Sequence, residues 1–177
     1  MMFFTISISK KMFYLISTLG CIICYANIPI KHTQITQPID KIIIEKSQRK
    51  LFLLIKGEII KTYRISLGTN PIGNKEYVGD HKTPEGSYVI DYKKPDSAFH
   101  LALHISYPSL KQIEIAKKNG YDSGGMIMIH GLKNGLGWIG RLHRFLDWTD
   151  GCIAVTNPEI EEIYQLSPEG TPVEIRP

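Results

Sequence analysis

The chain has 177 residues, which is enough for one domain with a hydrophobic core but not for two domains of ordinary size. Its formal net charge is +4. Two of its lysines lie in the first 26 residues, so the remainder has 19 basic and 17 acidic residues. This nearly neutral balance, without a run of Lys and Arg among aromatic residues, gives no reason to expect nucleic-acid binding.

Residues 1–26 have the composition of a secretory signal peptide. A positive start at Lys10 and Lys11 leads into an apolar stretch, residues 12–26, whose last three residues have the small-x-small pattern of a cleavage site. We predict that the chain is cut after Ala26 and exported to the periplasm or cell envelope.

Two other interpretations of this leader stay open. An uncleaved membrane anchor is disfavoured, because an apolar stretch of 15 residues is short for a bilayer span, which needs about 20. A lipoprotein signal would end at Gly20-Cys21, but the preceding Thr18-Leu19 matches such a signal poorly. Since no other segment is long and apolar enough to cross a membrane, we expect no stable membrane span after cleavage, and we expect a monomer.

The cysteine content singles out Cys152. The other two cysteines, Cys21 and Cys24, lie in the predicted leader. Thiols usually pair in an oxidising compartment, and a lone cysteine there cannot form an internal disulfide. Cys152 is therefore a link to another molecule, a buried inert thiol or a reactive group, and its neighbours in the sequence favour a reactive group.

The chain in order reads as a linker followed by a domain rich in strands. Residues 27–40 contain two prolines and many polar residues, as a linker does. Alternating or β-branched runs predict strands at Lys41–Glu45, Leu51–Ile55, Ile59–Leu67, Ser87–Tyr92, Phe99–Ile105, Met126–Ile129, Cys152–Val155 and Pro172–Ile175. The first three strands are expected to form an antiparallel meander.

Two short helices complete the predicted domain. The first is expected at Ser109–Lys118, closed by Asn119-Gly120, and the second at Pro158–Leu166, with Asn157 as its N-cap. Many short strands with few helices predict a mainly β, sandwich- or barrel-like domain over residues 41–177.

Two apolar strands each carry a reactive side chain beside a glycine. Met126–Gly131 contains His130, and Asp147–Val155 contains Cys152 directly after Gly151. Strand ends hold side chains precisely, and glycine permits close approach. A free thiol has a pKa of about 8.5 and needs a base, for which histidine is suited. We predict Cys152 as nucleophile and His130 as its base, with backbone N–H groups at Gly151 facing an oxyanion.

These motifs resemble the L,D-transpeptidase catalytic domain of the YkuD type. That family carries a His-Gly and a later Ser/Thr-His-Gly-Cys, which His130-Gly131 and Thr149–Cys152 resemble. Gly79–Gly86 resembles the family's Gly-Asp-x-x-Thr-Pro-x-Gly loop, and Lys41–Gly68 its opening strands. The resemblance covers about residues 41–177 and points to a subgroup with Thr-Asp-Gly-Cys in place of Ser-His-Gly-Cys.

The resemblance implies a cysteine acyltransferase that acts on peptidoglycan stem peptides and so affects the cell wall and cell shape. Cys152 would attack a diaminopimelate carbonyl of a tetrapeptide stem, release D-Ala and form a thioester, which an amine on a second stem would resolve. His130 would move the protons, and the N–H groups of Gly151 and Cys152 would bind the oxyanion, with Gly131 in support. No metal or organic cofactor is implied, and carbapenem-type inhibitors would bind.

Two positions depart from the family pattern. The usual histidine two residues before the cysteine is Asp150 here, and the usual arginine two residues after it is Ala154. That arginine is expected to help hold a substrate carboxylate. Arg141 and Arg144 are the candidates to replace it, and Trp148 is a candidate to line a substrate groove.

Several alternatives stay open beside this interpretation. Asp150 caps nearby N–H groups or orients His130. A zinc site from Cys152, His130 and His143 is disfavoured because the spacing fits no familiar zinc pattern. Besides the transpeptidase, the function can be a cysteine hydrolase of the same fold, in which water resolves the thioester, or a non-catalytic wall-binding module. The missing arginine motivates the hydrolase.

Overall fold

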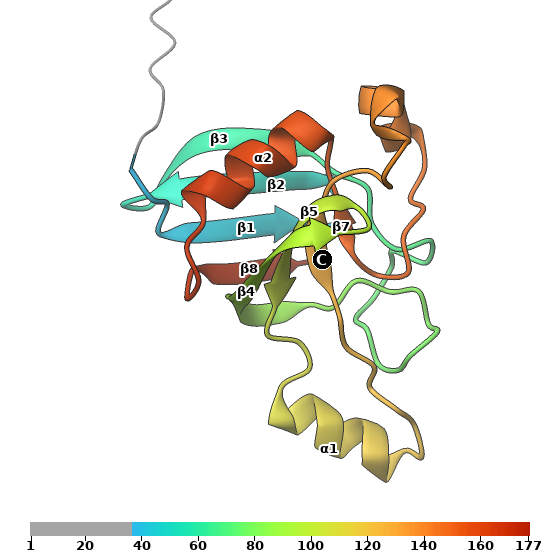
Figure 1. Cartoon of the computed structure of the whole chain (residues 1–177). Coiled ribbons are helices and arrows are strands. Elements are labelled where there is room, and N and C mark those ends of the chain that lie inside the picture. The colour runs from blue at the N-terminus through green and yellow to red at the C-terminus, as the bar shows by residue number, and fades with distance from the viewer. Residues whose placement is uncertain (1–36) are drawn as a thin grey trace, which may run out of the picture. The chain divides into compact units, whose positions relative to one another are not determined.

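The computed structural model describes residues 37–177, in which eight strands and two α-helices surround one core (Figure 1). The strands are β1 (Lys41–Glu45), β2 (Lys50–Ile55), β3 (Glu58–Arg64), β4 (Gly86–Ser97), β5 (His100–Ile105), β6 (Met128–His130), β7 (Ile153–Ala154) and β8 (Pro172–Arg176). The helices are α1 (Leu110–Lys118) and α2 (Asn157–Leu166). The predicted signal peptide and the linker up to residue 36 lie outside the described residues. Within residues 37–177, no helix has the length and apolar character that a bilayer span requires.

The strands form one sheet in the order β3-β2-β1-β8-β4-β5-β6-β7. The predicted antiparallel meander of β1, β2 and β3 is present. The last strand, β8, enters beside β1 in parallel and separates the meander from β4. The predicted mainly β fold with a few short helices is confirmed, but the sheet is not closed into a barrel. The segment after β3 reaches β7 only through an isolated bridge between Ser66 and Ala154.

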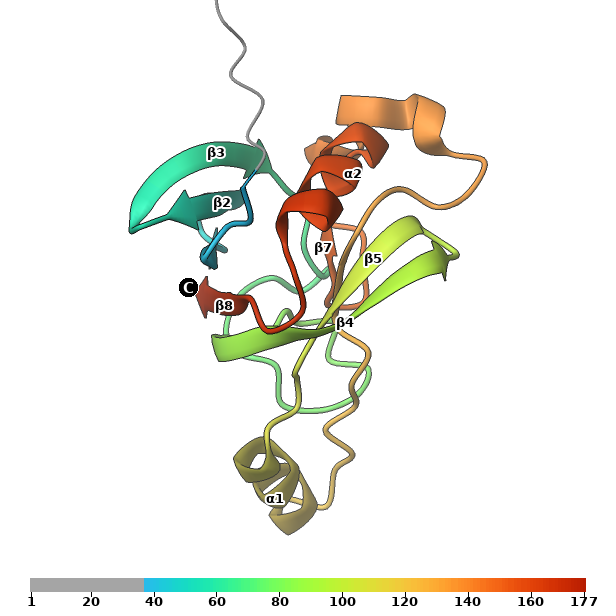
Figure 2. The same cartoon turned by 60° about the vertical axis from the view of Figure 1, so that its left-hand side comes forward.

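The core lies between the sheet and α2. Alternate residues of β1, Ile42 and Ile44, are buried, as expected for a strand with one face on the core. α2 contributes a stripe of buried side chains at Ile160, Ile163 and Leu166. Figures 1 and 2 show α2 lying across the strands of the meander with β5 on its other side, whereas α1 stands apart at the opposite end of the domain.

The two helix starts differ in how well the sequence predicted them. α1 begins at Leu110, one residue after the predicted start, and Ser109 is its N-cap in a capping box with Gln112. For α2 the predicted N-cap was wrong. Thr156 is the N-cap, and its backbone N–H donates to Glu159 Oε2 at 2.9 Å. Asn157 is used elsewhere, because its Oδ1 accepts the N–H of Leu132 at 2.8 Å and ties the loop after β6 to α2.

A buried lysine holds the long loop between β3 and β4. Lys46, in the turn after β1, is only 2% exposed. Its Nζ donates to the carbonyls of Gly73 and Thr83 at 2.6 and 3.0 Å and to Glu85 Oε1 at 2.7 Å. A buried charge with three partners orders a loop that the sequence alone describes only as long, polar and rich in glycine.

Replacing Lys46 by methionine is expected to lower the free energy of unfolding by about 3–5 kcal/mol, because the change leaves Glu85 and two carbonyls without a partner. Urea unfolding followed by circular dichroism measures the loss. Lys111→Met, at an exposed position of α1, is the matched control and should stay within about 0.5 kcal/mol of wild type. If Lys46→Met costs less than about 1 kcal/mol, this lysine does not hold the loop.

Candidate active site

The structure brings Cys152 and His130 into one pocket of about 330 Å³. β6 ends at His130, and β7 begins one residue after Cys152. The two strands pair in parallel, with His130 opposite Ala154. Because alternate residues of a strand face the same side, the Cys152 and His130 side chains lie on one face of the sheet. The predicted pair therefore shares a pocket through strand register.

The imidazole of His130 presents one free nitrogen. Its Nδ1 lies 2.6 Å from the carbonyl oxygen of Gly131, and because a carbonyl can only accept, Nδ1 must carry the proton. In the neutral ring this leaves Nε2 with a lone pair. The rings of Phe99 and Trp148 lie 4.6 and 5.8 Å from the imidazole. Burial lowers the pKa of His130 to about 4, so at neutral pH the ring is uncharged and can accept a proton.

The thiol of Cys152 is half-buried and protonated at neutral pH. Burial raises its pKa, and the charge of Asp150 acts in the same direction, whereas a hydrogen bond from the N–H of Met128 opposes the rise. The thiol donates to the carbonyl of Met126, with Sγ 3.6 Å from the oxygen. No hydrogen bond joins it to His130 among residues 37–177, so the thiol must leave Met126 before its proton can reach Nε2.

The residues just before the thiol form a tight turn. Thr149 Oγ1 accepts the N–H of Gly151 at 3.2 Å and donates to the carbonyl of Cys152 at 2.8 Å. Gly151 has φ +121°, and a Cβ there would lie 2.5 Å from the carbonyl oxygen of Lys82. Only glycine satisfies both conditions. Its N–H is already donated to Thr149, so the oxyanion role of Gly151 stays a prediction.

The loop Gly79–Gly86 packs its backbone against this turn. Thr83 is fully buried, and its Oγ1 accepts the N–H of Gly68 at 3.3 Å. A Cβ on Gly68 would lie 2.0 Å from the carbonyl oxygen of His81, so the two backbones touch. This loop carries no nucleophile into the pocket. It supports the segment that does.

Asp150 bonds a partner that the sequence did not suggest. Its Oδ1 lies 2.9 Å from Nδ1 of His81, and its side chain is 91% exposed. Neither of the two alternative roles considered for Asp150 is seen among residues 37–177, where its carboxylate bonds neither a backbone N–H nor His130. The Asp150 carboxylate instead bonds His81 at the surface. Gly131, the other residue predicted to support the site, accepts a hydrogen bond from His130 through its own carbonyl.

The predicted substrate residues divide into one that lines the pocket and two that do not. Trp148 lines it. Arg141 is exposed on the 3-10 segment Gly137–Phe145, and Arg144 is paired with Glu159 on α2. Neither candidate therefore stands in for the missing arginine in this pocket, because neither lines it and Arg144 already pairs with the partly buried Glu159.

The structure adds Lys94 and Phe99 to the pocket lining. Lys94 pairs with Ala102, Ala102 with His130, and His130 with Ala154, so the four residues form one row across β4, β5, β6 and β7. In the sequence, Lys94 sits in a charged stretch before a proline and looks like part of a turn. Only the register of four strands reveals its place, and no local signal could have found it.

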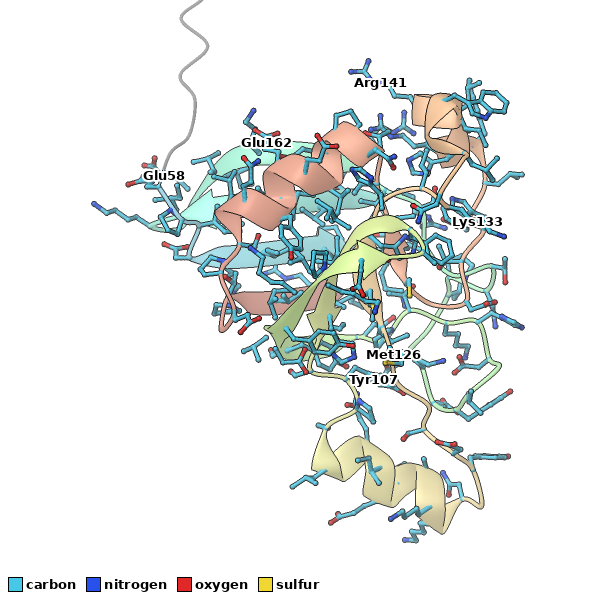
Figure 3. The ribbon with its side chains drawn as sticks, in the orientation of Figure 1. Glu58, Tyr107, Met126, Lys133, Arg141 and Glu162 are labelled. Atoms are coloured by element: carbon cyan, nitrogen blue, oxygen red, sulfur yellow. The ribbon has the colours of Figure 1, made fainter. Side chains whose placement is uncertain are left out.

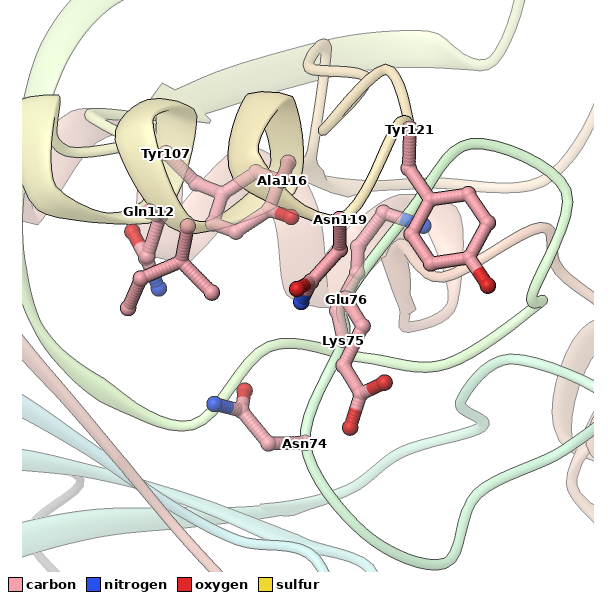
Figure 4. Close-up of a pocket in the computed structure, with 9 residues that line it drawn as sticks. Asn74, Lys75, Glu76, Tyr107, Gln112, Ala116, Asn119 and Tyr121 are labelled. Carbon is pink, nitrogen blue, oxygen red and sulfur yellow. The ribbon is translucent and has the colours of Figure 1, made fainter.

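Other histidines lie outside the thiol pocket. His143 is buried, with Nδ1 3.1 Å from Ser66 Oγ, and burial lowers its pKa to about 4. Residues 37–177 contain no group of three His, Cys, Asp or Glu side chains arranged to hold a metal ion. A separate pocket of about 300 Å³ lies between α1 and Asn74–Glu76 (Figure 4), and none of the predicted site residues lines it.

The two buried histidines predict a loss of stability in acid. Each has a folded pKa of about 4 against an ordinary value of 6.5, so between these limits the unfolded chain binds protons that the folded chain does not. Stability is therefore level above about pH 6.5 and falls as the pH drops toward 4, by up to about 2 kcal/mol per pH unit. Urea unfolding at pH 7 and pH 5 measures this slope.

The matched variant for this slope is His143→Gln, which removes one of the two groups. About half of the pH dependence should disappear, whatever the variant does to stability at pH 7. A slope between pH 7 and pH 5 that is unchanged in the variant would show that His143 is protonated in the folded chain.

The family comparison agrees with this geometry. The model of the L,D-transpeptidase catalytic domain, YkuD, matches residues 39–175. The Escherichia coli (strain K12) protein YafK, whose name assigns it provisionally to the L,D-transpeptidases, is 33% identical over 129 residues, which cover 70% of this chain and 45% of YafK. The chain thus spans about half the length of its curated relatives.

Solved structures show the same fold. The helical cell shape determining protein Pgp2 from Campylobacter jejuni is 26% identical with a TM-score of 0.59, over 79% of this chain and 48% of Pgp2. Bd1075 from Bdellovibrio bacteriovorus is 26% identical with a TM-score of 0.52, over 80% of this chain and 51% of Bd1075. Because the family model matches residues 39–175, most of its length, the chain belongs to the YkuD family of L,D-transpeptidase catalytic domains.

Proposed function

We propose that the chain is an exported cysteine acyltransferase that forms a thioester between Cys152 and a peptidoglycan stem peptide. The observation that carries the proposal is the shared pocket, in which a thiol and a neutral imidazole with a free Nε2 lie on one face of paired strands. These are the two groups that acyl transfer through a thiol requires.

The proposed reaction has two halves. Nε2 of His130 takes the thiol proton as Sγ of Cys152 attacks the diaminopimelate carbonyl, and the same proton passes to the leaving amine of D-Ala. An amine of a second stem then attacks the thioester and releases the thiol, which makes the cross-link. We infer that Thr149–Cys152 marks a subgroup of the family, since Asp150 stands where the family pattern has histidine.

A cysteine hydrolase is the second candidate, and the row across the sheet favours it. Ala154, opposite His130, is fully buried and uncharged, where the family pattern has an arginine. Lys94 in the same row is the cation that lines the pocket. A lysine cannot form the bidentate pair that arginine makes with a carboxylate, so it would hold the acceptor stem more weakly than the family's arginine. Water would then compete to resolve the thioester, and the product would be a shortened stem.

Mass spectrometry of the products separates these functions. The purified chain is incubated with tetrapeptide-stem muropeptides, with Cys152→Ala as the blank. A cross-linked dimer that has lost D-Ala indicates transpeptidation, and a monomeric tripeptide indicates hydrolysis. A carbapenem adduct on Cys152 reports a reactive thiol independently. If the folded chain changes no muropeptide and forms no adduct, acyl transfer is excluded; sacculus binding that survives Cys152→Ala would then indicate a wall-binding module.

Lys94, whose Nζ lies 3.5 Å from the exposed carboxylate of Asp96, is expected to exchange that partner for a carboxylate of the stem peptide. Replacing it by methionine should raise KM about tenfold and change kcat by less than about threefold, because a charge-assisted hydrogen bond of roughly 1.5 kcal/mol is lost from substrate and transition state alike. Lys94→Arg should restore most of the affinity, and Lys111→Met should leave KM unchanged. A fall in kcat without a change in KM would contradict this role.

A further inference from the structure

One edge of the domain exposes an unusual concentration of large apolar side chains. This apolar edge consists of Leu136, Trp138, Leu142, Phe145 and Leu146. Four of the five are more than 60% exposed, and Phe145 reaches 81%. Figures 1 and 2 show the 3-10 segment Gly137–Phe145 at the periphery, away from the sheet. Soluble proteins rarely expose so many large apolar side chains from one short segment, so the apolar edge marks a contact surface.

A pocket of about 440 Å³ lies beside the apolar edge. Apolar residues make up most of its lining, among them Leu136, Leu142 and Phe145 of the edge itself. Phe99 and Trp148 line this pocket and also the thiol pocket. Whatever covers the apolar edge therefore lies next to the candidate active site.

The segment that carries the apolar edge, residues 131–146, has charged side chains of a single sign. Residues 131–146 contain Lys133, Arg141 and Arg144 but no Asp or Glu. Arg144 is paired with Glu159, whereas Lys133 and Arg141 make no ion pair and no side-chain hydrogen bond within residues 37–177. Figure 3 shows Arg141 pointing away from the body of the domain, and Lys133 is exposed at the pocket beside the apolar edge. Two cations beside an exposed apolar surface complement an anionic partner.

A second copy of this chain fits the apolar edge poorly. A symmetric contact would place the same patch on both sides and bring Lys133 and Arg141 close to their own copies, with no acid in the segment to offset them. Exposed Trp, Phe and Leu flanked by Lys and Arg on a projecting segment are instead the composition of elements that lie in the interface of a bilayer.

We propose that the apolar edge docks on a bilayer containing anionic phospholipid. Trp138, Leu142 and Phe145 enter the boundary between headgroups and acyl chains, while Lys133 and Arg141 contact phosphates. This docking holds the thiol pocket close to the membrane surface. It does not depend on which reaction Cys152 performs.

The test uses the full chain and follows the fluorescence of Trp138. Binding of the chain to lipid would not be a sufficient readout, because the apolar leader, residues 12–26, can bind lipid by itself. The chain has two tryptophans, so Trp148→Phe leaves Trp138 as the only one. Phosphatidylcholine vesicles with and without phosphatidylglycerol are used, with brominated acyl chains as the quencher. Trp138 emission should shift to the blue and be quenched in the anionic vesicles, and Leu142→Ser with Phe145→Ser should weaken this about tenfold.

Matched variants separate the apolar edge from general surface effects. Ile72→Ser with Leu110→Ser removes two apolar side chains elsewhere that are at least as exposed, and it should leave quenching unchanged. Lys133→Glu with Arg141→Glu should abolish the preference for anionic vesicles, whereas Lys117→Glu with Lys118→Glu on α1 should keep it. Trp138 emission that stays water-like with every lipid overturns the proposal. So does self-association that protects Trp138 without lipid, since a second copy would then be the occupant.

Discussion

Replacing His130 by glutamine is expected to slow acylation of Cys152 by about 10²–10⁴-fold, the usual contribution of a positioned general base. The thiol pKa is raised by burial, so little thiolate exists at neutral pH without a proton acceptor. Nε2 of His130 is the acceptor that Gly131 leaves free. Intact-protein mass spectrometry of the carbapenem adduct, followed over time, measures the rate.

The acid side of the rate profile tests the same assignment in the wild type. Only the neutral imidazole can accept a proton, and the pKa of His130 lies at about 4. The acylation rate should therefore not decline at pH 6.5, where an ordinary histidine titrates, but only as the pH approaches 4. His104→Gln, at a buried histidine bonded to Asp91, is the control and should leave the rate within about threefold. A folded His130→Gln protein that acylates at the wild-type rate would remove His130 from the mechanism.

Local patterns in the sequence were enough for the strands and for the central pair. The β-branched, apolar run Lys41–Glu45 matches β1 residue for residue, and alternate residues of that strand lie on the core. Cys152 and His130 could be named because Cys152 begins one apolar run and His130 ends another, each beside a glycine. The α2 N-cap could not be chosen, since Thr156 and Asn157 are both suitable residues and a distant N–H, that of Leu132, decides between them.

The features that the sequence did not reveal depend on contacts between distant segments. The place of β8 beside β1 follows from a parallel pairing of the two ends of the domain. Lys94 lies at the site because of the register of four strands. Arg144 does not line the site, because it forms an ion pair with Glu159 on α2. Such pairings carry no local signature, so a resemblance to a motif predicts the nucleophile better than it predicts the substrate contacts.

At Gly151, the addition of a single methyl group is expected to slow acylation of Cys152 strongly. Gly151→Ala adds one methyl group, which would lie 2.5 Å from the carbonyl oxygen of Lys82, at a φ of +121° that disfavours any side chain. The turn can relieve the clash only by moving Cys152 or the loop Gly79–Gly86. Since a shift of about 1 Å at a reacting group can cost 10²-fold, acylation should fall by at least about that factor.

Alanine substitutions at two other glycines separate the two causes of this effect, which are backbone strain and a steric clash. Gly135→Ala places a side chain at φ +83° with nothing within 4 Å, so it measures backbone strain alone and should cost about 1 kcal/mol of stability without slowing acylation. Gly68→Ala has no such strain, but its Cβ would lie 2.0 Å from the carbonyl of His81. It should therefore slow acylation as Gly151→Ala does, because both push the same loop away from the thiol turn. If Gly151→Ala and Gly135→Ala behave alike, strain explains both, and the close packing of Gly79–Gly86 does not position Cys152.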